Sequence, residues 1–139
     1  MQFELVTLLG KKLDQEVYEV VLPTADGEIA VFPGHEPLVT LAVPGVIVVR
    51  HHKTDSQLDY FATSGGVIEI SQKRVRILVD EADHGDDIVE AEAKAALERA
   101  RTLHANASDQ IELEKASELI DRHAVRLKVA ELRRHKKSR

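Results

Sequence analysis

The chain has 139 residues, 43% of them hydrophobic and 31% charged, a balance typical of a folded protein with one modest core. It has no cysteine, which excludes disulfides and thiolate metal sites. The net charge of -5 is uneven, because residues 1–87 hold 7 Lys/Arg against 15 Asp/Glu and the remaining residues hold 12 against 9. Such a split indicates that the two parts of the chain meet different partners.

Up to about Asp80 the sequence consists of short β-branched runs separated by turn residues. The clearest predicted strands lie at residues 3–8, 17–21, 46–49, 58–62, 67–70 and 75–79. Turns are predicted at Asp26-Gly27, Pro33-Gly34, Pro44-Gly45 and Gly65-Gly66. No stretch of helical length separates these strands, so we predict a sandwich or barrel of antiparallel strands rather than a doubly wound sheet.

After Gly85 the apolar spacing changes from about two residues to about 3.6, which predicts two helices. Asp86 or Asp87 is predicted to cap the first helix and Asp109 the second, with Glu90 and Glu112 at capping-box spacing. The predicted apolar face of the first helix comprises Ala93, Ala96, Leu97, Ala100, Leu103 and His104. That of the second comprises Leu113, Ala116, Ile120, Ala124 and Leu127.

A turn at residues 106–109 makes the two predicted helices an antiparallel hairpin. Alanine predominates on the first of the two facing surfaces, and it buries little apolar area per residue. We therefore expect the hairpin to be among the least stable parts of the molecule. It should be able to detach from the β domain while the β domain stays folded.

Four stretches of the chain contain short sequence motifs. The first covers residues 22–40 and contains Gly27-Glu28, Pro33-Gly34-His35 and Pro37-Leu38. The others are Ser64-Gly65-Gly66 with the strand that follows it, residues 75–82, and residues 127–132. Together and in this order they resemble the epsilon subunits of bacterial and chloroplast ATP synthases. The resemblance implies an α+β fold, with an N-terminal antiparallel β-sandwich of about ten strands at residues 1–85 and a C-terminal antiparallel α-helical hairpin at residues 86–139.

The resemblance also implies a function. Epsilon subunits are non-catalytic rotor components of the central stalk that bind the gamma subunit, sit on the ring of c subunits and help to transmit rotation during proton-driven ATP synthesis. Glu28 matches the family position that faces the c ring, and His35 the position that faces gamma. Without the resemblance, Glu28 is interpreted as a solvated turn carboxylate and His35 as a turn histidine bonded to the backbone.

The end of the predicted arm is basic. The predicted inhibitory contacts are Arg122, Arg126, Arg133 and Arg134, and further cations are Lys128, Lys136, Lys137 and Arg139. In the family the arm can extend along gamma and block ATP hydrolysis, and it then meets an acidic segment of the catalytic beta subunits. Opposite charges favour encounter and register there. The helix dipole alone also stabilises cations at a helix C-terminus, by about 0.3–1 kcal/mol. It is the alternative explanation for the last four cations, Arg134, Lys136, Lys137 and Arg139.

We predict no cofactor and no metal. Some family members bind ATP through an Ile/Leu-Asp-x-x-Arg-Ala motif at the start of the first arm helix. In the aligned residues 88–93, Val89 replaces the aspartate and Glu92 replaces the arginine. A carboxylate in place of the cation repels a triphosphate, so we expect no tight ATP binding. His51-His52 lack metal-ligand spacing, and no phosphate-binding glycine loop is present.

Two other functions stay open. The first is a free-standing β-sandwich binding module whose helical arm recruits another acidic protein. The second is a small hydrolase that uses Ser64, although the residues after Ser64 are typical of a strand and not of the helix that a nucleophile elbow needs. Nucleic-acid binding is not expected, because the net charge is negative and the chain has only 3 Phe, 2 Tyr and no Trp.

Residues 1–5 lack the features of a secretory signal, and the longest nearly apolar run, 38–49, is far shorter than the roughly 20 residues of a membrane-spanning helix. We therefore expect a peripheral location on the cytoplasmic face of the bacterial plasma membrane, where the membrane is reached only through the complex. The stromal face of the chloroplast thylakoid is the second choice.

Overall fold

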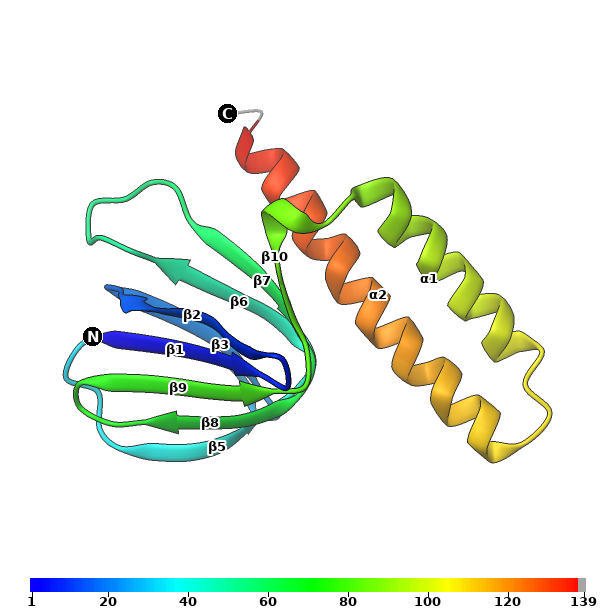
Figure 1. The fold of residues 1–139 in the computed structure, drawn as a ribbon, viewed down its shortest axis with the longest axis horizontal. Coiled ribbons are helices and arrows are strands. Elements are labelled where there is room, and N and C mark those ends of the chain that lie inside the picture. Colours follow the sequence, from blue (N-terminus) through cyan, green and yellow to red (C-terminus); the bar gives the residue numbers. More distant parts are fainter. Residues whose placement is uncertain (138–139) are drawn as a thin grey trace.

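A computed structural model describes residues 1–137, in which strands come first and helices follow (Figure 1). The strands are β1 Gln2–Thr7, β2 Gly10–Glu16, β3 Glu19–Thr24, β4 Gly27–Val31, β5 Leu38–Ala42, β6 Gly45–Arg50, β7 Asp59–Thr63, β8 Gly66–Ile70, β9 Arg74–Val79 and β10 Ala82–His84. A short 3-10 helix, η1 Gly85–Asp87, leads into helices α1 Glu90–Ala105 and α2 Gln110–Lys137. Arg139, predicted to belong to the basic end of the arm, lies outside the described residues.

The strands form one sheet in the order β10-β7-β6-β3-β5-β8-β9-β1-β2, with β4 paired to β3. The sheet curves around one hydrophobic core (Figure 1). The largest fully buried side chains of this core include Phe3, Leu5, Leu22, Ile47, Ile68 and Ile77. The predicted β-sandwich followed by a helical hairpin is therefore confirmed. The division of roles between residues 1–85 and 86–139 stays a prediction.

One pairing differs from the antiparallel expectation. Strands β1 and β9 are parallel, from Gln2 opposite Arg74 to Val6 opposite Leu78. A parallel pair needs a long connection, and here the whole of the chain between β1 and β9 supplies it. The N-terminal strand thereby joins the last long strand of the sandwich.

All six predicted strands are present, and the structure adds β2, β4, β5 and β10. Strand β2 is an edge strand whose side chains are mostly exposed and mostly charged, so it lacks the alternating apolar pattern. Charged edge strands resist pairing with other chains. Strand β5 was not predicted for the opposite reason: its outward residues Val39 and Leu41 are apolar as well, so apolar and polar residues do not alternate.

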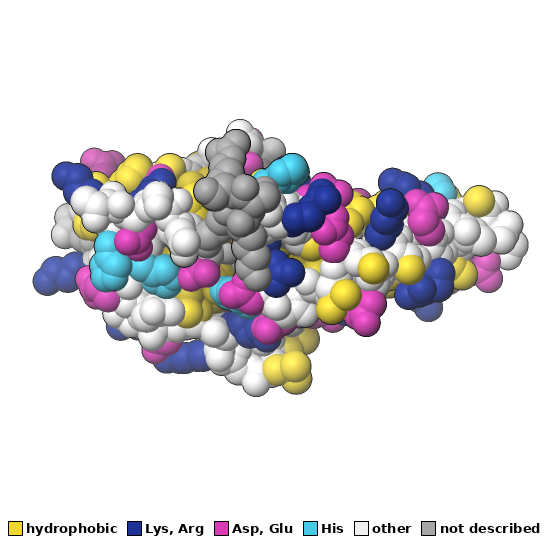
Figure 2. All heavy atoms as spheres, turned by 90° about the horizontal axis from the view of Figure 1, so that it is seen from above, with side chains coloured by type: hydrophobic (Ala, Val, Ile, Leu, Met, Phe, Trp, Pro, Cys, Tyr) yellow, Lys and Arg dark blue, Asp and Glu magenta, His cyan; other side chains and the backbone are white. Residues whose placement is uncertain are grey.

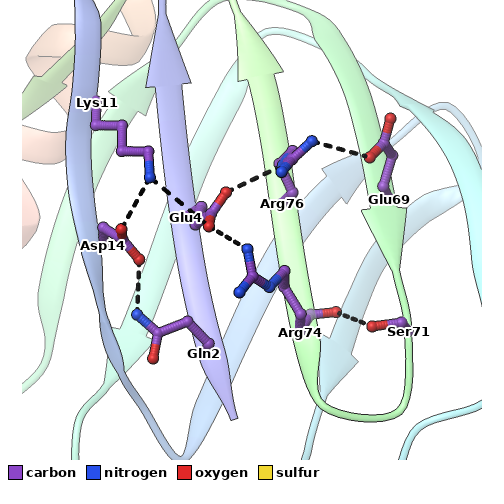
Figure 3. A network of polar contacts seen from close by, with 8 residues as sticks. All are labelled: Gln2, Glu4, Lys11, Asp14, Glu69, Ser71, Arg74 and Arg76. Atoms are coloured by element: carbon purple, nitrogen blue, oxygen red, sulfur yellow. Dashed lines mark hydrogen bonds and ion pairs between the residues drawn. The ribbon is translucent and has the colours of Figure 1, made fainter.

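A buried carboxylate ties β1 to its neighbours on the outer face of the sheet (Figure 3). Glu4 is only 3% exposed. It accepts hydrogen bonds from the guanidinium groups of Arg74 and Arg76, the latter at 3.0 Å, and the ammonium group of Lys11 lies 3.9 Å away. Arg76 also reaches Glu69 of β8 at 3.9 Å. The network therefore links four adjacent strands, β2, β1, β9 and β8, through side chains as well as backbone.

The helical hairpin is attached to the sandwich near one end only. A second, smaller apolar cluster joins Ala62 of β7 to the start of α1 and to the C-terminal half of α2. Its most buried members are Ile88, Val129 and Ala130, each exposed by 1% or less. The rest of the hairpin projects away from the sandwich (Figure 1). The turn between the helices is therefore remote from the anchored end.

The predicted cap of the first helix is wrong. Asp86 and Asp87 belong to η1, and α1 starts after Val89, which is the N-cap residue and provides no side-chain hydrogen bond. The reason is that Ile88 is extended and buried in the second cluster, which prevents a helix from starting before it. The corresponding prediction for the second helix is confirmed, because Asp109 Oδ1 accepts the Glu112 N–H at 2.8 Å.

The helix–helix seam agrees in part with the predicted faces. Ala93, Leu97 and Ala100 of α1 and Ala116 of α2 are buried. The predicted seam residues Leu103, His104 and Ala124 are exposed instead. Leu103, in the last turn of α1, is 57% exposed and Ile111, in the first turn of α2, is 65% exposed. The hairpin tip therefore leaves two apolar side chains uncovered, of which the predicted faces included only Leu103.

Gly66 explains part of the Ser-Gly-Gly motif. It opens β8 between two neighbouring strands, opposite Ala42 of β5 and Val79 of β9. A Cβ atom at this position would lie 1.9 Å from the backbone oxygen of Leu78 and 3.0 Å from the Cα atom of Val79. Backbone atoms in a hydrogen-bonded ladder cannot yield, so only glycine fits here.

We predict that Gly66→Ala lowers the free energy of unfolding by about 3 kcal/mol or more, because the added methyl group forces strands apart. Urea unfolding followed by circular dichroism measures this change. Gln72→Ala, an exposed position in the turn between β8 and β9, is the control and should shift stability by no more than about 0.5 kcal/mol. Equal unfolding midpoints for Gly66→Ala and the unmodified chain would contradict the steric explanation.

Candidate functional site

The two candidate residues of the sandwich lie toward opposite ends of β4, Glu28 within the strand and His35 after it. Glu28 is the second residue of β4, exposed, and opposite Pro23 of β3. His35 lies in the turn after β4, half-buried, with its Nδ1 atom 2.7 Å from the backbone oxygen of Glu36. The intervening part of β4 spans about 10 Å, at about 3.3 Å per residue. The structure therefore does not bring Glu28 and His35 together, and each belongs to a different surface.

An exposed apolar strip begins directly after the His35 turn. Val39 and Leu41 of β5 are 73% and 65% exposed. Leu41 lies opposite Val67 of β8, and Val67 lies opposite Leu78 of β9, so the strip crosses three strands. We define these residues, Val39, Leu41, Val67 and Leu78, as the β5 strip. Contiguous exposed apolar side chains of this kind are typical of protein interaction sites.

Each of the four predicted arm arginines forms an ion pair with an acidic residue at or near the anchored end. Arg122 Nε lies 2.8 Å from Glu81, and Arg126 donates a hydrogen bond to Asp83. Arg133 lies 3.7 Å from Asp86, and Arg134 Nε lies 3.4 Å from Glu90. Figure 2 accordingly shows basic and acidic side chains interspersed along the arm. The sequence predicted the arginines but not these partners.

A histidine–carboxylate cluster lies at the start of the segment that leads into the arm. Asp59 is bonded to two histidines, with Oδ2 2.5 Å from His51 Nε2 and Oδ1 3.2 Å from His84 Nε2. Burial opposes ionisation of Asp59, but the hydrogen bonds from His51 and His84 outweigh it and lower the pKa of this carboxyl group. His84 Nδ1 accepts the Asp86 N–H at 3.0 Å, so its Nε2 carries the proton that Asp59 accepts.

The histidine cluster therefore has a structural role in this conformation. The ring of His84 also packs edge-on against Phe61, with ring centroids 4.9 Å apart. His51, whose spacing in the sequence does not fit a metal site, is bonded to Asp59. Among residues 1–137 no group of three or more ligating side chains has the arrangement of a metal site.

Ser64 has backbone partners. Its hydroxyl group accepts the Glu81 N–H at 3.0 Å and donates to the Glu81 backbone oxygen at 3.3 Å. It thus fastens the β7–β8 turn to the chain that precedes β10. This arrangement supports the interpretation of Ser64 as a turn residue and gives no support to a hydrolase.

The segment aligned with the ATP-binding motif is engaged in the fold. Ile88 is buried, Val89 precedes α1, and Glu90 is paired with Arg134. Glu92 is exposed in the first turn of the helix. Two carboxylates thus stand at the start of this helix, and the absence of tight ATP binding stays a prediction.

His123 is a titratable group on α2 beside cations from both helices. Its Nδ1 atom is buried and has no hydrogen-bond partner among the described residues. Burial lowers the pKa of His123, and Arg122, Arg126 and Arg99 lower it further, whereas Glu81 opposes them. Protonation of His123 is therefore unfavourable in the folded hairpin.

We predict that the hairpin becomes less stable as the pH falls below about 6.5, the ordinary pKa of histidine. In this range the unfolded state binds more protons than the folded state. The contribution of neutral His123 to the free energy of unfolding is therefore fully present above pH 6.5, and it is lost as the pH falls toward the lowered pKa of His123. Hydrogen exchange of the α1 and α2 amides between pH 5 and 7.5 measures the effect. His123→Gln should remove part of this pH dependence, whereas His104→Gln, at an exposed position, should not. Identical pH profiles of hydrogen exchange in the two variants would refute the role of His123.

None of the helices in the described residues combines the length and apolar character that crossing a membrane requires.

Comparison with known proteins relates the chain to one family. Residues 1–85 match the family model described as ATP synthase, Delta/Epsilon chain, beta-sandwich domain. The chain is 35% identical over 136 residues to the ATP synthase epsilon chain of Herpetosiphon aurantiacus, with 98% of each chain covered. It is 38% identical over 123 residues to that of Xanthomonas campestris, with 85% of this chain and 86% of the relative covered.

Two solved structures are similar as well. The first is one chain of the Euglena gracilis mitochondrial ATP synthase, in a structure of OSCP, F1 and the c-ring, with a TM-score of 0.78 at 25% sequence identity. The match covers 92% of this chain and 79% of the Euglena chain. A chain of the Tetrahymena thermophila mitochondrial ATP synthase central stalk and c-ring gives a TM-score of 0.61 at 14% identity. The second likeness concerns the fold alone.

Proposed function

Because the chain belongs to the ATP synthase delta/epsilon family, we propose that it is a non-catalytic subunit of the central stalk that couples the gamma subunit to the c ring and restrains ATP hydrolysis with its helical arm. The observation that carries the proposal is the arm itself. It is anchored near one end, and its four arginines are held by surface ion pairs that water or a partner can replace.

Gamma is proposed to bind the surface made by the His35 turn and the β5 strip. The chain runs from His35 directly into β5, so the polar turn and the apolar strip form one continuous surface. An apolar strip with a polar rim is the usual composition of a protein interface. Glu28, at the other end of β4, is proposed to face the polar loops of the c ring, which separates the two partners on the sandwich.

We predict that the double substitution Val39→Glu and Leu41→Glu weakens gamma binding at least about 100-fold, because two carboxylates would be buried against the partner. Both side chains are exposed in the free chain, so the sandwich should keep its stability. Titration calorimetry with purified gamma measures the affinity. Leu103→Glu with Ile111→Glu, also exposed apolar positions but on the hairpin tip, is the matched control. Unchanged gamma affinity in the β5 variant would exclude this surface.

The four arginines are proposed to contact an acidic segment of the catalytic beta subunits when the arm is extended. No catalytic residue of its own is proposed for the chain, and neither is nucleic-acid binding. Its location is proposed to be peripheral, on the cytoplasmic face of the plasma membrane, where it reaches the membrane only through the complex.

The test is ATP hydrolysis by a catalytic head from the same source from which the native subunit has been removed. We expect the full chain to bind and inhibit, and a chain ending at Asp87 to bind without inhibiting, because it keeps the sandwich core and lacks the arm. Arg133→Glu with Arg134→Glu should weaken inhibition. Equal inhibition by both forms would contradict a regulatory arm, and no binding at all would favour the free-standing binding module.

A further inference from the structure

We infer that four acidic residues, Glu81, Asp83, Asp86 and Glu90, form an internal docking site that competes with the acidic segment of a partner for the arm arginines. The inference rests on the proposed function and deepens its regulation. We call these residues the acidic row. They all lie in the short stretch of chain that joins the sandwich to the first arm helix.

The order of the pairs shows that the acidic row and α2 match each other. As the residue number of the acid rises from Glu81 to Glu90, that of its arginine rises from Arg122 to Arg134. The row and the helix therefore run in the same direction. The two segments are thus in contact through four successive ion pairs.

In the extended part of the acidic row, the distance between neighbouring acids also matches the distance between neighbouring arginines of α2. Glu81 and Asp83 are two residues apart, so they point to the same side of an extended chain at a separation of about 6.6 Å. Arg122 and Arg126 are four residues apart, so they point to the same side of a helix at a rise of about 6 Å. The two pairs can thus form together without distortion of either element.

The internal and external contacts use the same arginine groups. The side chains of Arg126 and Arg133 are each only 26% exposed. Arg126 is moreover held by a hydrogen bond to Asp83, whose own side chain is 35% exposed. While α2 is docked, most of each side chain is covered and its guanidinium group is paired, so a partner that pairs with these arginines has to displace the acidic row.

One polar group of the docked arm is not satisfied. Arg133 has its Nε atom buried without a hydrogen-bond partner among the described residues, and its guanidinium lies 3.7 Å from Asp86. A buried donor without a partner disfavours the docked state, and release would return it to water. The docked state therefore has an energetic cost that release removes, and the loss of an ion pair of the acidic row should increase the released fraction.

This competition predicts opposite effects for the two sides of each pair. Neutralising an acid releases the arm but leaves the arginines intact, so inhibition of hydrolysis should increase. Neutralising an arginine releases the arm and also removes the external contact, so inhibition should decrease. A purely structural role of the acidic row predicts no such reversal of sign.

The experiment uses full chains with two spin labels, attached at Lys53→Cys on the sandwich and Leu103→Cys on the arm. Both positions are exposed, and the chain has no other cysteine. Asp83→Asn with Glu81→Gln should increase the fraction of molecules with a released arm by about two- to fivefold for each ion pair removed. The released arm is detected as new distances between the two spin labels. The same unlabelled variant should inhibit the depleted catalytic head more strongly than the unmodified chain.

Two variants complete the design. Glu98→Gln is the matched control, because Glu98 is an arm acid paired with Arg101 of the same helix at 2.7 Å, and it should change neither distances nor inhibition. The exchange of Asp83→Arg with Arg126→Asp should restore docking, and it should not restore inhibition, because the arm then offers a carboxylate to an acidic partner.

The outcomes separate this inference from the proposed function. Unchanged label distances in the Asp83→Asn, Glu81→Gln variant, while the unmodified full chain inhibits, would overturn the docking site and leave the proposed function standing. New distances without any inhibition by either chain would support the docking site and contradict the regulatory role. New distances with weaker inhibition would overturn the competition, since release would then not favour the inhibitory state.

Discussion

The position of the helical arm depends on one small apolar contact, in which Ile88 and the C-terminal half of α2 are buried against the sandwich. Full burial of Ile88 or Val129 contributes about 1.5–3 kcal/mol each, and the alanines beside them contribute less. The sandwich core, in contrast, contains Phe, Leu, Ile and Val side chains from nearly every strand. We therefore expect the two parts of the molecule to differ widely in stability, with an arm that can undock while the sandwich stays folded.

The same contact shapes the segment that joins the two parts. Because Ile88 has to be extended to reach its site, α1 starts two residues later than the aspartates predicted, and those aspartates fall in η1. His84 and Asp86 then connect this segment to Asp59 on one side and to Arg133 on the other. Residues 81–90 thus act both as the covalent link and as the surface on which α2 rests.

The sequence predicted most of the fold, because alternating and helical periods are local signals. It missed β2, whose side chains are mostly charged on both faces, and β5, whose side chains are mostly apolar on both faces, since neither gives an alternation. The candidate site was harder. Glu28 and His35 followed from a family resemblance, and nothing in their local pattern sets them apart. The arginines stood out as a basic run, but Arg126 and its partner Asp83 are 43 positions apart, and pairing at that range is decided by how the hairpin folds back.

The charge asymmetry of the sequence acquires a different meaning in the structure. A segment with an excess of cations was expected to present a basic surface to an acidic partner, yet its four arginines are already paired with carboxylates from the neighbouring segment. Net charge along a chain therefore does not give the charge that the folded surface offers. When a partner offers carboxylates too, release exchanges one set of ion pairs for another of the same kind. The difference between two such sets is small, so under the proposed competition we expect modest changes in the acidic row or in its surroundings to decide which partner holds the arm.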